Sequence, residues 1–253
     1  MKRIVLLQVA AAMLLVQTAH SHVAPSVDDN NRYVKLTPMS DRVRLAYTVF
    51  MGQVPGAAAR RQLDSNHDGK IADAEAQTFG VKLGDEVRMS LALTVDGAQV
   101  PVTWTTVSMG MGSADVNAGA FSIDLIAWVC LPAPGATHEV TLRDGFIIAR
   151  PGETEIKIED SLGIAISKAS LAGVQNEEHD FRLAGAGGPL ATEGLQLGFT
   201  VGPDAPGAAD GSCKTVIKAG VPPFVFVFAG GLVATVLAAL VVILARRSAK
   251  TAA

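Results

Sequence analysis

The chain has 253 residues, of which 49% are hydrophobic and 18% are charged, and its formal net charge is −3. This mildly acidic balance argues against a nucleic-acid-binding protein, which needs a basic face. Two terminal segments inflate the hydrophobic fraction, and the roughly 200 residues between them are enough for one globular domain with a substantial core.

Residues 1–21 have the layout of a secretory signal peptide. A basic tripeptide is followed by the apolar residues 4–16 and then by small residues, so cleavage is expected after Ser21. The apolar run is shorter than the ~18–20 residues that a membrane span needs, which favours a cleaved signal over an uncleaved anchor. The mature chain would then begin at His22.

Residues 22–201 are predicted to form an exported domain that is mainly β. Residues 43–50 alternate between apolar and more polar side chains, the period of two that a half-buried strand shows. Asp96-Gly97 favours a tight turn, which predicts a hairpin between strands at 91–95 and 99–107. Many short strands separated by turn signals indicate a β-sandwich-like fold. The other expected strands are residues 33–37, 120–131, 138–143, 155–159, 163–167 and 196–201.

A complete EF-hand calcium-binding pattern spans residues 64–75, between helices expected at 55–63 and 73–89. Such a loop needs side-chain oxygens at positions 1, 3 and 5, a glycine at 6, a backbone carbonyl at 7 and a glutamate at 12. Glycine at position 6 permits the sharp turn that lets alternate side chains converge on the ion. A polar turn that binds nothing is the alternative, but the match in fixed register favours Ca²⁺. The matching residues are Asp64, Asn66, Asp68, Gly69, Lys70 and Glu75.

Three of these residues, Asp64, Asp68 and Glu75, carry negative charge, so their mutual repulsion predicts a loop that is looser without metal. The sequence contains no second EF-hand loop, and the short strand through Ile71 at position 8 therefore lacks the partner that paired hands supply. We expect one structural calcium ion rather than a sensor. Extracellular calcium sites bind at about 10⁻⁴ to 10⁻³ M.

Two cysteines, Cys130 and Cys213, leave two interpretations open. An even pair in an exported protein suggests a disulfide, whereas Cys130 alone could be a buried thiol within a strand. Other groups with ligand chemistry are interpreted as incidental: His22 as a mobile terminus, residues 177–180 as a solvated loop, and Met109-Gly110-Met111 as a flexible loop. No catalytic constellation is present, so the protein is not expected to be an enzyme.

The C-terminal part is predicted to cross the membrane once. Residues 202–221 are interpreted as a flexible stalk, residues 222–245 as the transmembrane helix and residues 246–253 as a cytoplasmic tail. Arg246-Arg247 follow the apolar run directly, which places the tail inside and the main domain in the periplasm or outside the cell. Small residues recur every fourth position in the span and could form a homodimer seam: Gly230, Ala234 and Ala238.

Several segments in order resemble one known family. Residues 41–49 (DRVRLAYTV), 53–55 (QVP) and 63–71 (LDSNHDGKI), followed by 93–97 (LTVDG) and 142–146 (LRDGF), are similar to the periplasmic domain that precedes the permease in bacterial nickel/cobalt efflux-type transporters. The resemblance covers about residues 22–160 and implies an exported β domain with an inserted calcium loop beside a metal permease. The permease helices themselves are not in this sequence, so transport does not carry over.

These features predict a calcium-binding, single-pass envelope protein that acts as a binding or accessory module beside a metal permease. One alternative is a subunit of an ion-transport complex, in which the lone helix assembles with partner helices. Another is a surface protein whose helix and basic tail serve as a sorting tag.

Overall fold

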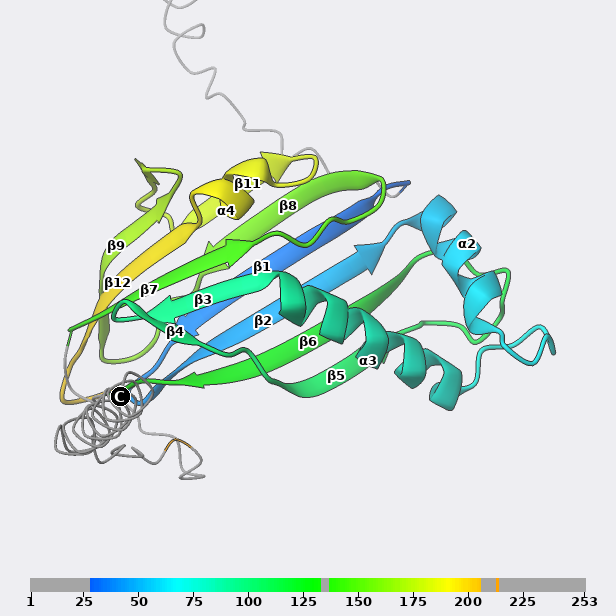
Figure 1. Ribbon diagram of the computed structural model, residues 1–253, viewed down its shortest axis with the longest axis horizontal. Helices are drawn as coiled ribbons and strands as arrows, with labels where there is room; N and C mark the ends of the chain where they lie inside the picture. Colours follow the sequence, from blue (N-terminus) through cyan, green and yellow to red (C-terminus); the bar gives the residue numbers. More distant parts are fainter. Residues whose placement is uncertain (1–27, 133–136, 206–212, 214–253) are drawn as a thin grey trace, which may run out of the picture. The chain divides into compact units, whose positions relative to one another are not determined.

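The computed structural model describes residues 28–132, 137–205 and 213, which form two six-stranded sheets packed face to face (Figure 1). The mainly β fold is therefore as expected, and it is sandwich-like. The predicted signal peptide, the transmembrane helix at 222–245 and its small-residue seam lie outside the described residues. Among the helices that are described, none has both the length and the apolar character to cross a bilayer.

The first sheet contains the strand whose alternation the sequence makes plainest. In β2, Leu45 and Tyr47 have no exposed surface and face the core, whereas Ala46 and Thr48 on the other face are half-buried. All neighbours in this sheet are antiparallel except β1 and β8, which are parallel. Its order is β11 (Asp180–Ala184), β8 (Pro151–Ile158), β1 (Asn30–Pro38), β2 (Arg42–Met51), β6 (Phe121–Cys130) and β5 (Trp104–Gly110).

The second sheet is antiparallel throughout and covers the inner face of the first. Its β3–β4 hairpin turns at Asp96 (φ 51°) and Gly97 (φ 77°), both left-handed, as the dipeptide predicts. The order is β10 (Val174–Gln175), β9 (Ile164–Leu171), β12 (Leu195–Val201), β7 (Thr137–Asp144), β3 (Leu91–Val95) and β4 (Ala98–Val100).

The prediction of a single strand at 99–107 is wrong. The chain leaves the second sheet after β4 and joins the first sheet as β5. Pro101 lies in the break, where a residue without a backbone N–H can donate no ladder hydrogen bond. Strand β11 and the short helix α4 (Gly188–Thr192) are not among the elements expected from the sequence.

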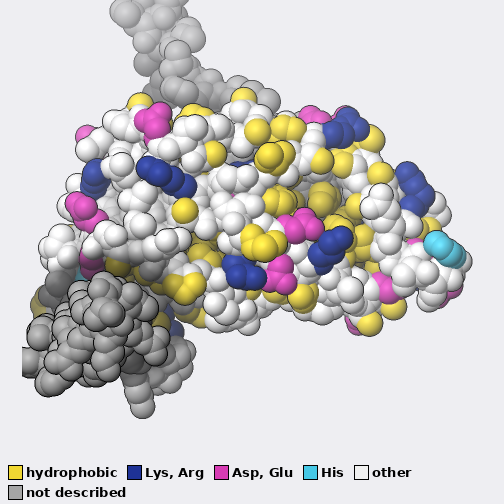
Figure 2. Space-filling model, viewed as in Figure 1, with side chains coloured by type: hydrophobic (Ala, Val, Ile, Leu, Met, Phe, Trp, Pro, Cys, Tyr) yellow, Lys and Arg dark blue, Asp and Glu magenta, His cyan; other side chains and the backbone are white. Residues whose placement is uncertain are grey.

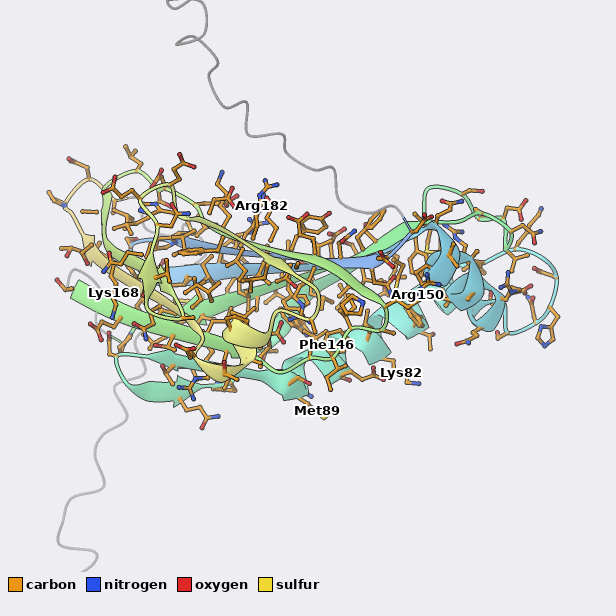
Figure 3. The ribbon with its side chains drawn as sticks, turned by 90° about the horizontal axis from the view of Figure 1, so that it is seen from above. Lys82, Met89, Phe146, Arg150, Lys168 and Arg182 are labelled. Atoms are coloured by element: carbon orange, nitrogen blue, oxygen red, sulfur yellow. A yellow bond between two sulfur atoms is a disulfide. The ribbon has the colours of Figure 1, made fainter. Side chains whose placement is uncertain are left out.

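Helices α2 (Gln53–Leu63) and α3 (Asp73–Ser90) form the expected insertion between β2 and β3. Helix α3 packs on the first sheet, where Trp104 Nε1 donates to the carbonyl of Gly84 at 2.6 Å. A Cβ at Gly84 would meet Leu125 and Trp104 at 3.2 Å, so glycine permits this close approach. Seen from above, α3 lies in the layer of the second sheet, and the insertion extends past one end of the sandwich (Figure 3).

The two sheets are joined through a buried polar network as well as through apolar packing. Asp144, at the end of β7, accepts from Arg32 Nη1 at 2.7 Å and from Tyr47 OH at 2.8 Å through the same oxygen, Oδ2. All three side chains are almost completely buried. Burial raises the pKa of Asp144, and the Arg32 charge is the strongest influence opposing that shift.

A disulfide joins Cys130 at the end of β6 to Cys213, which decides between the two interpretations of the cysteines. The two cysteines are 83 positions apart in the sequence, so the bond closes a large loop. On the chain-entropy estimate, a loop of that size is worth about 4.5 kcal/mol of stability.

Candidate metal site

The loop that follows α2 curls around the carboxylate of Asp64. This side chain is buried and accepts the backbone N–H groups of Asp68 at 3.1 Å and Gly69 at 3.0 Å. The curl requires left-handed backbone at His67 (φ 58°) and Gly69 (φ 83°). A Cβ at Gly69 would meet nothing within 4 Å, so the glycine is needed for its conformation and not for space.

The next two predicted ligands also turn back toward the loop backbone. Asn66 Oδ1 accepts from the N–H of Asp68 at 2.9 Å, and Asp68 Oδ1 accepts from the N–H of Lys70 at 2.8 Å. Positions 1, 3 and 5 of the pattern are thus brought together in one turn. The carbonyl expected to act at position 7 belongs to Lys70, whose side chain is exposed.

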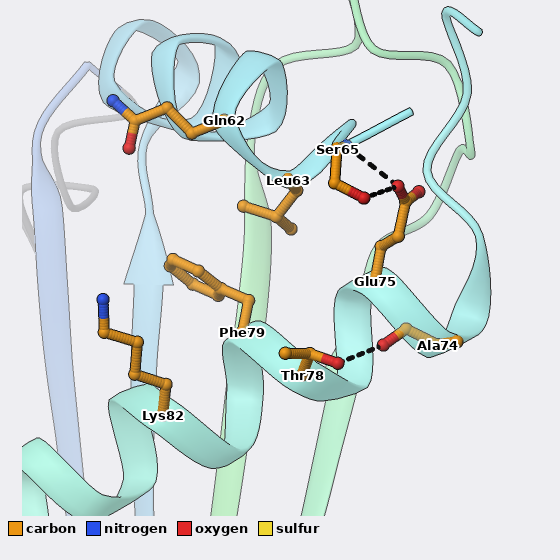
Figure 4. Close-up of a pocket in the computed structure, with 8 residues that line it drawn as sticks. All are labelled: Gln62, Leu63, Ser65, Ala74, Glu75, Thr78, Phe79 and Lys82. Atoms are coloured by element: carbon orange, nitrogen blue, oxygen red, sulfur yellow. Dashed lines mark hydrogen bonds between the residues drawn. The ribbon is translucent and has the colours of Figure 1, made fainter. Parts of the chain in front are cut away.

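Glu75, at position 12, links the start of α3 to the start of the loop (Figure 4). Its Oε1 accepts from both the N–H of Ser65 at 2.8 Å and the Ser65 hydroxyl at 2.6 Å, and its Oε2 accepts from the N–H of Ala72 at 3.0 Å. These bonds favour the ionised carboxylate, and the Ser65 hydroxyl is the first cause of the lowered pKa of Glu75.

Within the described part of the chain, no three His, Cys, Asp or Glu side chains converge as a metal centre would require. Glu75 is engaged by Ser65 and Ala72 instead. The donors at the five ligand positions are nevertheless all oxygens, which suits a hard cation such as Ca²⁺ and not the ions that prefer nitrogen or sulfur. The residue types fit calcium, and ligation by Glu75 would replace its bonds to Ser65.

The position-8 strand pairs with a segment other than a second hand. Ile71, which is buried, donates its N–H to the carbonyl of Ala114 at 2.7 Å, and Val116 donates to the carbonyl of Gly69 at 3.1 Å. Lys70 and Asp115 form the antiparallel bridge between these bonds. The partner is the segment joining β5 to β6, which carries no EF-hand pattern.

Arg60, near the end of α2, holds that same segment. Its guanidinium is fully buried, and burial lowers its pKa while the nearby charge of Asp115 opposes the shift. It also lies over the ring of Phe121, 5.4 Å from the centroid. All its hydrogen-bond acceptors are backbone carbonyls, those of Met111, Ser113 at 2.7 Å, Asp115 at 3.2 Å, Gly119 at 2.9 Å and Ala120 at 3.3 Å.

Met109 and Met111, interpreted from the sequence as incidental residues of a flexible loop, have a packing role. Both lie against a small apolar cluster, formed by Leu63, Ile71 and Ala76, beneath the loop. A Cβ at Gly80 of α3 would meet Met109 Sδ at 2.7 Å, so the helix and this strand are in close contact. The apolar cluster anchors the polar loop to the sandwich.

A groove of about 350 Å³ lies between α2 and α3, beside the loop (Figure 4). Leu63 and Phe79 supply its apolar lining, and Gln62, Lys82 and Glu75 supply polar groups. On the face of the domain shown in Figure 2, basic and acidic side chains are interspersed with apolar ones, so this face carries no extended field of one sign.

Neither protein-family models nor curated proteins give a match to this chain.

Proposed function

We propose that residues 64–75 bind one calcium ion and that the ion fixes the helical insertion to the β-sandwich. The observation that carries this proposal is the loop itself, in which the carboxylates and amide at positions 1, 3 and 5 are already ordered around a left-handed glycine. An oxygen-only donor set with a glutamate at its end is what Ca²⁺ requires.

Each residue has a separate part in binding. Asp64, Asn66 and Asp68 supply side-chain oxygens, and Lys70 supplies its backbone carbonyl. Glu75 supplies its carboxylate after exchanging the Ser65 hydrogen bonds for the ion. The bound cation offsets the repulsion among three carboxylates, so the occupied loop is the stiffer one.

The domain acts, in this proposal, as a membrane-anchored binding or accessory module beside a metal permease. The Cys130–Cys213 disulfide supports export, because such bonds persist in oxidising compartments. The apolar run at 222–245 with basic residues after it supports one membrane crossing. Protease added to spheroplasts should digest the domain; protection of the domain until the cells are lysed would contradict this topology.

Calcium binding is tested by titration calorimetry and thermal melting of the full-length protein. The wild type should release or absorb heat with a Kd of about 10⁻⁴ to 10⁻³ M. At a hundred times Kd, binding should add about 2.7 kcal/mol of stability, or roughly 5–10 °C for a domain of this size. Both effects should vanish in Asp64→Ala/Glu75→Gln.

The matched control is Asp73→Asn, which removes one exposed negative charge at position 10 of the same loop, where no ligand is expected. This variant should bind calcium nearly as the wild type does. A wild type that shows neither heat nor a melting shift at 10 mM calcium, about ten times the weakest expected Kd, would remove the proposal.

A further inference from the structure

The segment between β5 and β6 occupies the place that a second hand takes in paired EF-hands. We call residues 111–120 the support loop. It is hydrogen-bonded to the ion-binding loop at Ile71 and Val116, on either side of the Lys70–Asp115 bridge. These bonds involve the backbone at positions 6 and 8 of the ion-binding loop, directly beside the ligand at position 7.

Arg60 links the support loop to α2. It belongs to the helix that leads into Asp64, and its guanidinium binds carbonyls at both ends of the support loop, at Met111 and at Ala120. A buried guanidinium without carbonyl acceptors would be left with uncompensated charge. Arg60 therefore requires the support loop in its observed conformation, and α2 and the support loop are ordered together.

Besides these bonds, the support loop has turn hydrogen bonds from the N–H of Asn117 to Asp115 Oδ1 at 2.7 Å and from the N–H of Ala118 to the carbonyl of Asp115 at 3.1 Å, and Gln53 Oε1 accepts from the N–H of Ala120 at 3.2 Å. Ser113, Ala114, Asp115 and Asn117 are exposed, and their segment lies outside the ladders of β5 and β6. Segments with few buried apolar groups and exposed backbone open locally at low free energy. The bonds to Gly69, Ile71 and Arg60 are thus a large share of what holds this loop in one conformation.

We propose that the support loop and Arg60 are the second half of the ion-binding unit, so that calcium at residues 64–75 orders the support loop and Arg60 positions the loop for calcium. This inference rests on the proposed calcium site. A ligand that stabilises the bonded conformation must bind it more tightly than the open one, and the coupling is reciprocal. Arg60 is a positioning residue, because it contacts the carbonyls and not the ligand oxygens.

Amide hydrogen exchange of the full-length protein measures the first half of the coupling. Saturating calcium should slow exchange at the amides of Ile71 and Val116 by about tenfold, the usual scale of coupling between sites. Amides in the centre of β7 provide an internal reference, since they lie in the sandwich and should change little.

Calcium affinity of Arg60→Met measures the second half. Methionine keeps an apolar side chain but removes every guanidinium donor, and calcium should bind about tenfold more weakly. Arg61→Met is the matched control, because it makes the same chemical change at the neighbouring, exposed position of α2. Its affinity should equal that of the wild type.

The outcomes separate the two proposals. If the wild type gives no calcium heat, the proposed function fails and the coupling fails with it. If the wild type binds calcium but exchange at Ile71 and Val116 is unchanged, the coupling alone is refuted. If Arg60→Met binds calcium as tightly as the wild type, the positioning role of Arg60 is refuted. Should Arg60→Met fail to fold, Arg60→Lys, which keeps the charge but loses the fork of donors, takes its place in the affinity measurement.

Discussion

Replacing Arg32 with methionine should destabilise the sandwich strongly. The change removes the partner of Asp144 across the two sheets, where Arg32 Nη1 lies 2.7 Å from Asp144 Oδ2 and both side chains have no exposed surface. The carboxylate keeps only Tyr47 OH at 2.8 Å and the N–H of Phe146 at 2.8 Å. Removing one partner of a buried pair costs about 3–5 kcal/mol, or roughly 6–20 °C in Tm for a domain of this size.

The cost should also depend on pH. Burial raises the pKa of Asp144 and Arg32 opposes that shift, so Arg32→Met should raise the pKa of Asp144 further. A raised carboxyl pKa gives stability that is present below the ordinary aspartate range and lost as pH rises through the folded-state pKa. Since the variant has the higher folded-state pKa, its deficit relative to the wild type should grow from acid to neutral pH.

Urea unfolding followed by circular dichroism at several pH values measures both effects. The matched variant is Arg32→Met/Asp144→Leu, in which neither charge remains. It should be more stable at neutral pH than Arg32→Met by at least about 1 kcal/mol, because no uncompensated carboxylate is left in the core. Two results together would refute this account of the network. The double variant would lose as much stability as the Arg32→Met and Asp144→Leu single variants combined, and the deficit of Arg32→Met would not vary with pH.

Three further changes test other parts of the domain. Reducing the disulfide between β6 and Cys213 should lower the free energy of unfolding by about 4.5 kcal/mol, visible as an earlier urea midpoint; an unchanged midpoint would contradict the loop-closure argument. Gly56→Ala should lower the free energy of unfolding, measured by thermal melting, by about 1–3 kcal/mol, because its Cβ would lie 2.7 Å from the carbonyl oxygen of Gly119. In the control Gly188→Ala, the Cβ would meet nothing within 4 Å, so this variant should be as stable as the wild type. The pKa of Glu159 is lowered, first by the hydrogen bond from the Thr37 hydroxyl. The stability that ionised Glu159 contributes is therefore present above the ordinary glutamate pKa and lost as the pH falls through the lowered pKa. Glu159→Gln should reduce the loss of stability in acid by under about 1 kcal/mol, because the carboxylate is 30% exposed.

The strands that the sequence located best are those with one buried face. From Val43 to Val49 in β2, apolar and more polar side chains alternate, because the second sheet covers only one face of the first. This period of two is visible in the sequence. Strand β11 alternates too, with Phe181 and Leu183 toward the core and Asp180 and Arg182 on the other face, but it is an edge strand of only five residues. A period of two over so few residues is a weak indication of a strand. Its pairing with β8 depends on residues far away in the sequence.

Buried arginines mark the limit of reasoning from composition. Arg32, Arg42 and Arg60 are among the largest side chains with almost no exposed surface, although arginine belongs on the surface by its polarity. Each is compensated differently: Arg32 by a carboxylate from the other sheet, Arg42 by the neighbouring Asp41 and the ring of Trp128, and Arg60 by backbone carbonyls. Only the Asp41 partner is adjacent in the sequence.

The candidate metal site likewise has one part that the sequence predicts and one part that it does not. Its proposed ligand positions fall within twelve consecutive residues, so the coordination chemistry of calcium predicts them from the sequence. What supports them comes from residues 111–120, and it acts through carbonyl and amide groups that every residue possesses. No side-chain pattern distinguishes a segment used in this way. The sequence therefore shows a loop with no second EF-hand pattern to pair with. In the structure, residues 111–120 bond to the position-8 strand of this loop and accept hydrogen bonds from Arg60 of the helix that leads into it.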